Sequence, residues 1–484
     1  MADNLQQKTF SGMIWTFAQH FSLEGFAFVQ GIILARLLVP RDYGLIAMTQ
    51  IFFAIARVFI DSGFGNALMR KQNRKEIDYS TVFVTNFVLT FYFAVVLYLL
   101  APSIGAFYDE PILKDIIRAN AFLLVLNSVN AVQATRLRIN LQFKVYGFIS
   151  VVSTVSIGII TIIFAYMGYG VWSLIYPNFL APFLNFFLYW HFQRWRPKLQ
   201  FSWNIWREYF AYGSNLLLAS LITKIWDNLY PFIIGKKFSA VDLGFYSRAH
   251  GYANLPATSF QGTLNSVTFP VLSSIQDDDS RLKDAYRRLI RVSGYVVFPM
   301  LMGLAALAKP IILVLITDKW AASIPFLVVI CFAVMLRPIQ VLNLNLLKVK
   351  GRSDLVLKLE VIKKAIYLLV VLFTMNFSVM AMCIGGVLSS HIALFINTYY
   401  TGKIIHVGYF VQMKDLLPSF LFSITMGFLV YASTFVFSNM LVQLIVGVII
   451  GITYYYLVSV LFKSSELDYI KLLLRENLVK RPRK

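Results

Sequence analysis

The sequence has little charge, few cysteines and no long polar stretch. Only 14% of its 484 residues are charged, whereas 58% are hydrophobic and the mean hydropathy is +0.68. No polar stretch is long enough to form a soluble domain, which excludes an ordinary soluble protein. Both cysteines, Cys331 and Cys383, lie in apolar runs. We interpret them as small buried side chains, and expect neither a disulfide framework nor a cysteine metal site.

The sequence also lacks motifs for energy-coupled or metal-dependent catalysis. Its glycines match no Walker-type phosphate loop, and no HExxH or comparable metal or hydrolase constellation occurs. The longest predicted outer loop, SIGAFYDEPILKD at 103–115, is too short to hold a catalytic domain. We therefore predict a carrier without cofactor or bound metal, and not an enzyme.

What the sequence has instead is a series of long apolar runs. A run of about 20 residues spans a bilayer as a helix, which satisfies the backbone groups internally. The first run follows a weakly charged start without a cleavage site, so we expect it to be retained. We predict an all-α integral membrane protein with spans near 11–38, 43–69, 79–104, 113–137, 146–168, 170–193, 208–235, 241–270, 287–307, 320–347, 354–375, 378–405, 415–436 and 439–462.

The positive charges are distributed unequally between the two predicted sides. With the N-terminus inside, the inner segments hold 32 of the 44 Lys and Arg residues and the outer segments hold 8. Cytoplasmic loops carry such an excess, so we predict that both termini are cytoplasmic. These basic segments then face anionic membrane lipids, so the net charge of +21 does not require nucleic acid as a partner.

Two short stretches 200 residues apart resemble each other. LVPRDYGLIAM begins at residue 38 and AVDLGFYSRAHG at residue 240, so that Asp42 aligns with Asp242 and Gly44 with Gly244. An even number of spans separates them, which indicates parallel repeats related by an axis near the membrane normal. We predict two six-helix lobes at 1–200 and 201–412, helices 13 and 14 at 413–463, and an amphipathic basic tail at 464–484.

Aspartate and glycine have structural roles in such turns. Asp42 and Asp242 can accept hydrogen bonds from the free N–H groups at a helix start. Gly44 and Gly244 remove a side chain where the chain turns tightly. We therefore interpret these four residues as structural.

Charged residues also occur inside the predicted spans. At a rise of about 1.5 Å per residue, Arg57, Lys224 and Arg337 lie near the middle of the bilayer. Arg248 lies near the outer mouth. Charges at this depth are costly and usually face a cavity or a partner, so these four cations are our candidate substrate contacts.

Three acidic residues accompany them. Asp61 is four residues after Arg57, Asp227 is three after Lys224, and Glu24 lies in the first span. Two interpretations stay open: each pair neutralises itself as a structural ion pair, or the cations line a central cavity. The same carboxylates, Glu24, Asp61 and Asp227, are candidates for coupling to a proton or sodium ion.

Three sequence motifs carry a resemblance to a known family: ILARLLVPRDYGLIAM, DLGFYSRAHGYANLP and VTFPVLSSIQDD. They resemble bacterial polysaccharide flippases of the multidrug/oligosaccharidyl-lipid/polysaccharide exporter superfamily, in the branch of Wzx/WzxC-like and teichuronic acid exporters. The resemblance covers nearly the whole chain. It implies a fold like that of multidrug and toxin extruders (MATE), with fourteen helices and a central cavity that opens alternately to each side.

The resemblance also implies a function. The expected cargo is an undecaprenyl-diphosphate-linked oligosaccharide, moved from the inner to the outer leaflet of the bacterial inner membrane for O-antigen, capsule or exopolysaccharide assembly, with polymerase machinery as a candidate partner. A multidrug antiporter is the main alternative, because it shares the fold but would favour acidic residues in its cavity. A membrane polymerase or ligase is a weaker alternative, because it would need a larger outer loop.

Overall fold

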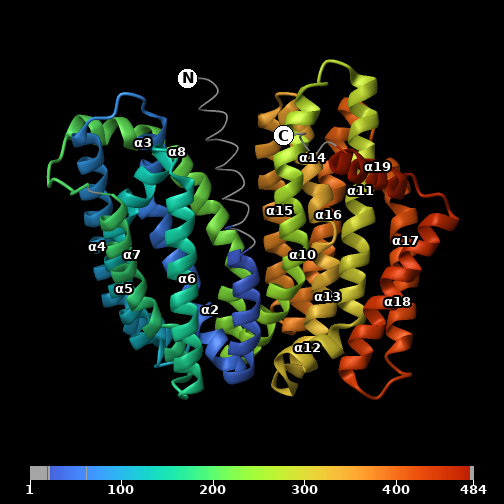
Figure 1. Cartoon of the computed structure of the whole chain (residues 1–484), viewed down its shortest axis with the longest axis horizontal. Helices are drawn as coiled ribbons and strands as arrows, with labels where there is room; N and C mark the ends of the chain where they lie inside the picture. The colour runs from blue at the N-terminus through green and yellow to red at the C-terminus, as the bar shows by residue number, and fades with distance from the viewer. Residues whose placement is uncertain (1–18, 20–21, 62, 194, 480–484) are drawn as a thin grey trace. The chain divides into compact units, whose positions relative to one another are not determined.

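The computed structural model describes residues 19, 22–61, 63–193 and 195–479 (Figure 1). The predicted cytoplasmic segment 1–10, the start of the first span and tail residues 480–484 lie outside this part. Every regular element within it is an α- or 3₁₀-helix. Ten of these helices are long and apolar enough to cross a membrane, and a bent pair would make eleven. The all-helical membrane class is confirmed, whereas the count of fourteen stays a prediction.

One helix shows why the counts differ. The predicted span at 354–375 is the helix α15 (Ser353–Thr374), but its first twelve residues carry Asp354, Lys358, Glu360, Lys363 and Lys364. A helix with this many charges does not qualify as a span by composition alone. Its length of 22 residues would still cross a bilayer.

The helices form two compact units, Met1–Gly244 and Phe245–Lys484. The boundary falls inside α10 (Ala240–Ser273), just after its first turn. The first unit therefore includes helices that the sequence repeat assigns to the second copy. The predicted lobes 1–200 and 201–412 stay a prediction.

In the first unit, α4 packs along α5, and α2 contacts both α4 and α8. Figure 1 shows α4, α5, α6 and α7 in the blue to green part of the chain. Residues 22–37 are also helical. The remaining bounds are α2 (Pro40–Asp61), α3 (Phe64–Arg70), α4 (Glu76–Phe107), α5 (Leu113–Ile139), α6 (Phe143–Tyr166), 3₁₀ turns at Gly170–Leu174 and Tyr176–Phe179, α7 (Leu180–Phe192), α8 (Trp203–Asp227) and α9 (Leu229–Lys237).

The Lys- and Arg-rich connections of this unit contact one another at one end of the unit, which we call the basic end. Lys71 Nζ lies 2.9 Å from Asp78 and 3.2 Å from Glu208. Burial disfavours the charged form of Lys71, but the hydrogen bonds to both carboxylates together raise its pKa above the ordinary value. Gln133 donates to the carbonyl of Trp195 at 3.0 Å. The connections after α3, α5 and α7 therefore meet at this end.

In the second unit, α11 packs along α17, and α16 contacts α13, α14 and α15. The core between these helices is apolar, with Phe298 and Leu301 on α11 almost fully buried. The elements after α10 are α11 (Asp279–Ala306), α12 (Ala308–Ile316), a 3₁₀ turn (Asp318–Ser323), α13 (Ile324–Val334), α14 (Arg337–Val349), α15, α16 (Val379–Ile405), α17 (Tyr409–Ser433), α18 (Met440–Leu461) and α19 (Ser465–Val479). Both cysteines are free and buried in this unit.

A helix forms in the predicted tail, where α19 packs against α11. Glu466, in its first turn, pairs with Arg291 of α11 at 3.1 Å. The Arg288 guanidinium lies 5.2 Å from the ring centre of Tyr469. The start of the tail is therefore attached to the protein, and its contact with the membrane surface stays a prediction.

Candidate transport site

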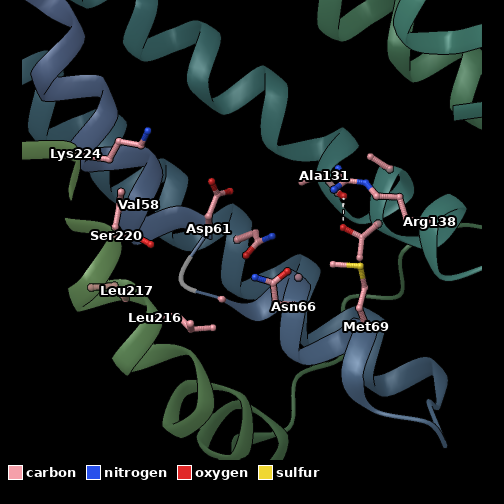
Figure 2. Close-up of a pocket in the computed structure, with 15 residues that line it drawn as sticks. Val58, Asp61, Asn66, Met69, Ala131, Arg138, Leu216, Leu217, Ser220 and Lys224 are labelled. Carbon is pink, nitrogen blue, oxygen red and sulfur yellow. Dashed lines mark hydrogen bonds between the residues drawn. The ribbon is translucent and has the colours of Figure 1, made fainter. Parts of the chain in front are cut away.

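A cavity of about 470 Å³ lies within the first unit, between α2, α3, α4, α5 and α8. Figure 2 shows Lys224, Asp61 and Arg138 around it, one each from α8, α2 and α5. The polar residues that line it are Asp61, Asn66, Asn86, Thr135, Arg138, Ser220 and Lys224. The lining combines two cations and one anion with neutral hydrogen-bonding groups.

A break in the backbone places Asp61 at this cavity. Helix α2 ends at Asp61, and Gly63 has a φ of +72° before α3 begins at Phe64. Glycine adopts this left-handed conformation at little cost. A Cβ on Gly63 would also come within 2.8 Å of the Cα of Gly213 on α8. The glycine thus permits both the break and the close approach of α8.

Lys224 reaches the cavity from α8, near a second break at Asn228, where α8 and α9 meet at an angle of 42°. Its Nζ lies 3.8 Å from the carboxylate of Asp227, and the two side chains are 50% and 59% exposed. The predicted ion pair therefore exists, but it is long and open. Such a pair contributes about 0–1 kcal/mol, so it leaves the ammonium able to bind another anion.

Arg138 is a cavity residue that the sequence interpretation missed, because it was counted as a loop cation. Helix α5 continues to Ile139, and the Arg138 guanidinium lies 4.9 Å from the ring centre of Tyr146. A signal was present in the sequence. Ala131, Ala134, Thr135 and Arg138 all line the cavity, and their spacing is that of one helix face.

Arg57 and Glu24 are not among the residues that line this cavity. Arg57 has an exposed side chain on α2, one turn before Asp61. Glu24 is exposed on the helical segment 22–37. Of the predicted sites in this unit, the structure brings Asp61 and Lys224 to the same cavity.

The other two predicted cations lie in the second unit. Arg337 is the first residue of α14, and its Nη1 donates a hydrogen bond to Oδ1 of Asn254 on α10. Asn254 in turn donates to the carbonyl of His250 at 2.7 Å. This neutral partner orients the guanidinium without cancelling its charge. Arg248 lies 5.6 Å from the ring centre of the buried Trp320.

The four predicted turn residues lie at two helix starts. The Asp42 carboxylate accepts from the N–H of Val39 at 3.1 Å. Asp242 forms a reciprocal pair with Ser239, since its N–H donates to Ser239 Oγ at 3.0 Å and its carboxylate accepts from that hydroxyl at 2.6 Å. Asp42 thus accepts an N–H at the start of α2, whereas at α10 the hydroxyl of Ser239 accepts the N–H and the Asp242 carboxylate accepts that hydroxyl, so the role of Asp242 as an N–H acceptor stays a prediction.

The two glycines touch each other's turns. A Cβ on Gly44 would lie 1.7 Å from the carbonyl oxygen of Ala240, and one on Gly244 would lie 1.9 Å from that of Pro40. The two contacts are equivalent under the repeat, because a shift of 200 residues exchanges Gly44 with Gly244 and Pro40 with Ala240. Two copies related by a twofold axis produce such a reciprocal contact.

A polar, charged cavity among bilayer-length helices is typical of a membrane transporter. A family model described as "Polysaccharide biosynthesis protein" matches residues 33–325, and the chain belongs to this family.

Curated relatives are transport and biosynthesis proteins of bacterial polysaccharides. The chain is 25% identical over 422 residues to the lipopolysaccharide biosynthesis protein WzxC of Escherichia coli, covering 86% of this chain and 83% of WzxC. It is 24% identical over 355 residues to the teichuronic acid biosynthesis protein TuaB of Bacillus subtilis, covering 73% of each.

Solved structures show the fold. The lipid II flippase MurJ in an inward closed conformation matches with a TM-score of 0.73 and 16% identity, over 93% of this chain and 98% of MurJ. An inward-facing multidrug resistance MATE transporter matches with a TM-score of 0.57 and 14% identity, over 81% of this chain and 94% of that one. The predicted MATE-like fold and the resemblance to polysaccharide transporters are confirmed.

Proposed function

We propose that this protein moves an undecaprenyl-diphosphate-linked oligosaccharide from the inner to the outer leaflet of the bacterial cytoplasmic membrane by alternating access. The basic end of the first unit then faces the cytoplasm, as the distribution of Lys and Arg favours. The product feeds O-antigen, capsule or exopolysaccharide assembly, where polymerase machinery is a candidate partner. The cavity with Lys224 and Arg138 is the observation that carries this proposal.

The chemistry of the lining fits the cargo. A diphosphate leaves the headgroup layer only where fixed positive charge replaces its hydration, and Arg138 offers the geometry for bidentate phosphate binding. Asn66, Asn86 and Ser220 offer neutral donors and acceptors that suit sugar hydroxyls. The polyprenyl tail needs no polar site, because it can stay in lipid.

The remaining predicted cations, Arg57, Arg248 and Arg337, are proposed as further phosphate contacts along the route. A membrane potential that is negative inside favours outward movement of an anion by about 2.3 kcal/mol per charge per 100 mV. A proton or sodium ion is the candidate coupling ion, with Asp61, Asp227 and Glu24 as its sites. Asp61 is the one of these that lines the described cavity.

Binding of purified protein to undecaprenyl diphosphate lipid tests the proposal. We expect Lys224→Gln and Arg138→Gln to weaken binding about tenfold each, the loss of one charge-assisted phosphate contact. The matched control is Lys358→Gln, an exposed lysine on α15. Equal binding by all three variants would contradict a phosphate site in this cavity.

A cation antiporter is the second candidate, and Asp61 in the cavity is the observation that favours it. Asp61→Asn distinguishes the two. For a flippase, loss of this anion leaves lipid diphosphate binding intact or stronger, because a repulsive charge is removed. For an antiporter, the variant loses export of cationic dyes from cells, and lipid diphosphate has no effect on that export.

A further inference from the structure

A cluster of aromatic side chains lies at the end of the first unit opposite the basic end. Helix α6 starts at the basic end and α7 returns to it, so the turns that join them lie at the other end. We infer that this cluster binds the glycan part of the cargo by stacking on its sugar rings, once the glycan is on the outer side of the membrane. The inference rests on the proposed function, which supplies the glycan. The cluster, here called the aromatic platform, consists of Phe164, Tyr169, Trp172 and Tyr176.

The rings of the platform pack against one another. Tyr176 stacks on Trp172 with centroids 5.0 Å apart and an interplanar angle of 15°. Tyr169 lies 5.0 Å from Phe164 and meets Tyr176 nearly edge-on at 6.5 Å. The side chains of Tyr169 and Tyr176 are nevertheless 46% and 42% exposed. A ligand therefore meets rings whose orientations are already fixed, and its binding orders few further side chains.

Two glycines direct the chain from α6 into the platform. Gly168 has a φ of +84° and Gly170 a φ of +54°, conformations that glycine adopts at little cost. The N–H of Tyr169 donates to the carbonyl of Phe164 at 3.2 Å, and the N–H of Gly168 donates to that of Ala165 at 3.1 Å. This pair of hydrogen bonds is the Schellman motif that commonly ends a helix. The helix end thus brings Tyr169 back beside Phe164.

The other side of the same turns is anchored in the protein. Val171 and Ile175, which alternate with the platform residues, are only 4% and 1% exposed. The Asp42 carboxylate accepts a hydrogen bond from the backbone N–H of Val171 as well as from that of Val39. Asp42 therefore holds the platform to the start of α2. One side of the turns is fixed, and the other presents aromatic rings to the surroundings.

The second repeat joins its corresponding helices by a much shorter connection. The predicted repeat pairs α6 and α7 with α15 and α16. The connection occupies residues 167–179 in the first copy, with two 3₁₀ turns, and residues 375–378 in the second. A short turn is thus sufficient to reverse the direction of such a helix pair. The longer aromatic segment of the first copy therefore has a purpose beyond connecting helices.

The chemistry of the platform fits sugar rings better than charged groups. The sequence has no Asp, Glu, Lys or Arg between Lys144 and Arg194, so this segment supplies no charge to hold a diphosphate. Sugar rings have apolar C–H faces that are bordered by hydroxyl groups. The aromatic faces can pack on the C–H faces, while the phenol groups of Tyr169 and Tyr176 exchange hydrogen bonds with the sugar hydroxyls.

Binding of free oligosaccharide to the purified protein in detergent tests the platform. The probe is the repeat-unit oligosaccharide released from lipid-linked cargo by mild acid, without the prenyl chain or the diphosphate. We expect Tyr176→Ala and Tyr169→Ala to weaken binding about tenfold each, because each removes one stacking partner. Tyr176→Phe should keep most of the affinity, because the ring remains. The matched control is Phe187→Ala, which removes a 68% exposed ring from the regular helix α7.

Two results of this measurement would overturn the inference. One is the absence of oligosaccharide binding by the unchanged protein. The other is equal affinity in Tyr176→Ala, Tyr169→Ala and Phe187→Ala. Exposed tyrosines also anchor proteins at the membrane interface, a role that needs a bilayer. Lower abundance in the membrane with unchanged affinity in detergent would assign the two tyrosines to that role instead.

Thiol labelling tests on which side of the membrane the platform lies. In a background with Cys331→Ser and Cys383→Ser, Tyr166→Cys places a thiol at the end of α6, where Tyr166 is 82% exposed. We expect a membrane-impermeant maleimide to label it in intact cells, and the oligosaccharide to slow its labelling in the purified protein. Tyr176→Ala in the same chain should remove this protection. Labelling only in broken cells, or labelling that the oligosaccharide does not slow, would contradict an outer glycan site.

A second probe, undecaprenyl diphosphate without sugar, separates the platform from the proposed function. Tyr176→Ala should bind this lipid as the unchanged protein does, because the platform supplies no charge. If the unchanged protein binds the oligosaccharide but not the lipid, the platform is supported and the proposed diphosphate site is contradicted. If it binds the lipid but not the oligosaccharide, the diphosphate site is supported and the platform is overturned.

Discussion

The core of the second unit and the transport cavity of the first unit use polar residues in opposite ways. In the second unit, Asn343, Thr401 and Gln412 are fully buried and hydrogen-bonded to one another at 3.0–3.2 Å. In the first unit, Lys224 and Asp227 are half exposed and 3.8 Å apart. Saturated, buried groups fix helices in place, whereas open, loosely paired groups remain available to a ligand. The comparison separates the polar residues that hold the fold from those that we propose as cargo contacts.

The strongest ion pairs show the same contrast. Arg287 binds Asp415 with two hydrogen bonds of 2.6 and 2.7 Å, and Asp415 is 8% exposed. This bidentate pair joins α11 to α17, and Arg291 connects it to Glu466 at the start of α19. Among the described residues, the cavity cation Lys224 has a longer and more exposed carboxylate contact, at 3.8 Å from Asp227.

The largest expected effect comes from breaking the buried pair. Asp415→Ala removes the buried carboxylate that Arg287 binds with two hydrogen bonds, and because the Arg287 side chain is 32% exposed and can be hydrated, we expect a loss of about 2–3 kcal/mol of folding free energy. We expect a lower melting temperature of the purified protein and lower abundance in the membrane. Asp354→Ala is the control, because its pair with Arg352 is exposed at 51% and 62%. An equal loss of stability and abundance in both variants would show that buried and exposed ion pairs contribute equally to folding.

A smaller effect is expected from Arg337. Arg337→Ala removes a proposed phosphate contact, and we expect transport to fall about tenfold, with partial recovery in Arg337→Lys because the charge returns without the bidentate geometry. Asn254→Ala keeps the charge but removes its hydrogen-bond partner. It should reduce transport less than Arg337→Ala. If Arg337→Ala instead lowers abundance while transport per molecule stays normal, Arg337 belongs with the structural residues.

The smallest expected effect on stability comes from the exposed ion pair at the cavity. Lys224→Gln removes one member of an exposed pair, so the melting temperature should change by no more than a degree or two, equivalent to less than about 1 kcal/mol. Differential scanning fluorimetry in detergent measures this. A destabilisation as large as that of Asp415→Ala would show that Lys224 holds the fold.

Sequence patterns predicted much of this molecule where the determinants are local. Helices, caps and the glycine turns depend on neighbouring residues, and the capping contacts of Asp42 and Asp242 are of this kind. Partners that come from distant segments were not predictable. Asn254 lies 83 residues before Arg337, and only the folded arrangement of the second unit brings the two side chains together.

The candidate site was predicted only in part for the same reason. Asp61 and Lys224 stood out because charge inside an apolar run is costly wherever the run packs. Arg138 did not, because a cation at a helix end can belong equally to a loop. Its position at the cavity depends on α5 continuing to Ile139 and on the packing of α2 and α3 against α5.

The most direct test is the leaflet distribution of lipid-linked oligosaccharide in cells that carry Lys224→Gln together with Arg138→Gln. The proposed function predicts that cargo accumulates in the inner leaflet while the protein remains at normal abundance, and that Lys224→Arg with Arg138→Lys restores much of the transport. Normal outward movement of cargo in the Gln double variant would contradict the proposal that this cavity carries the diphosphate.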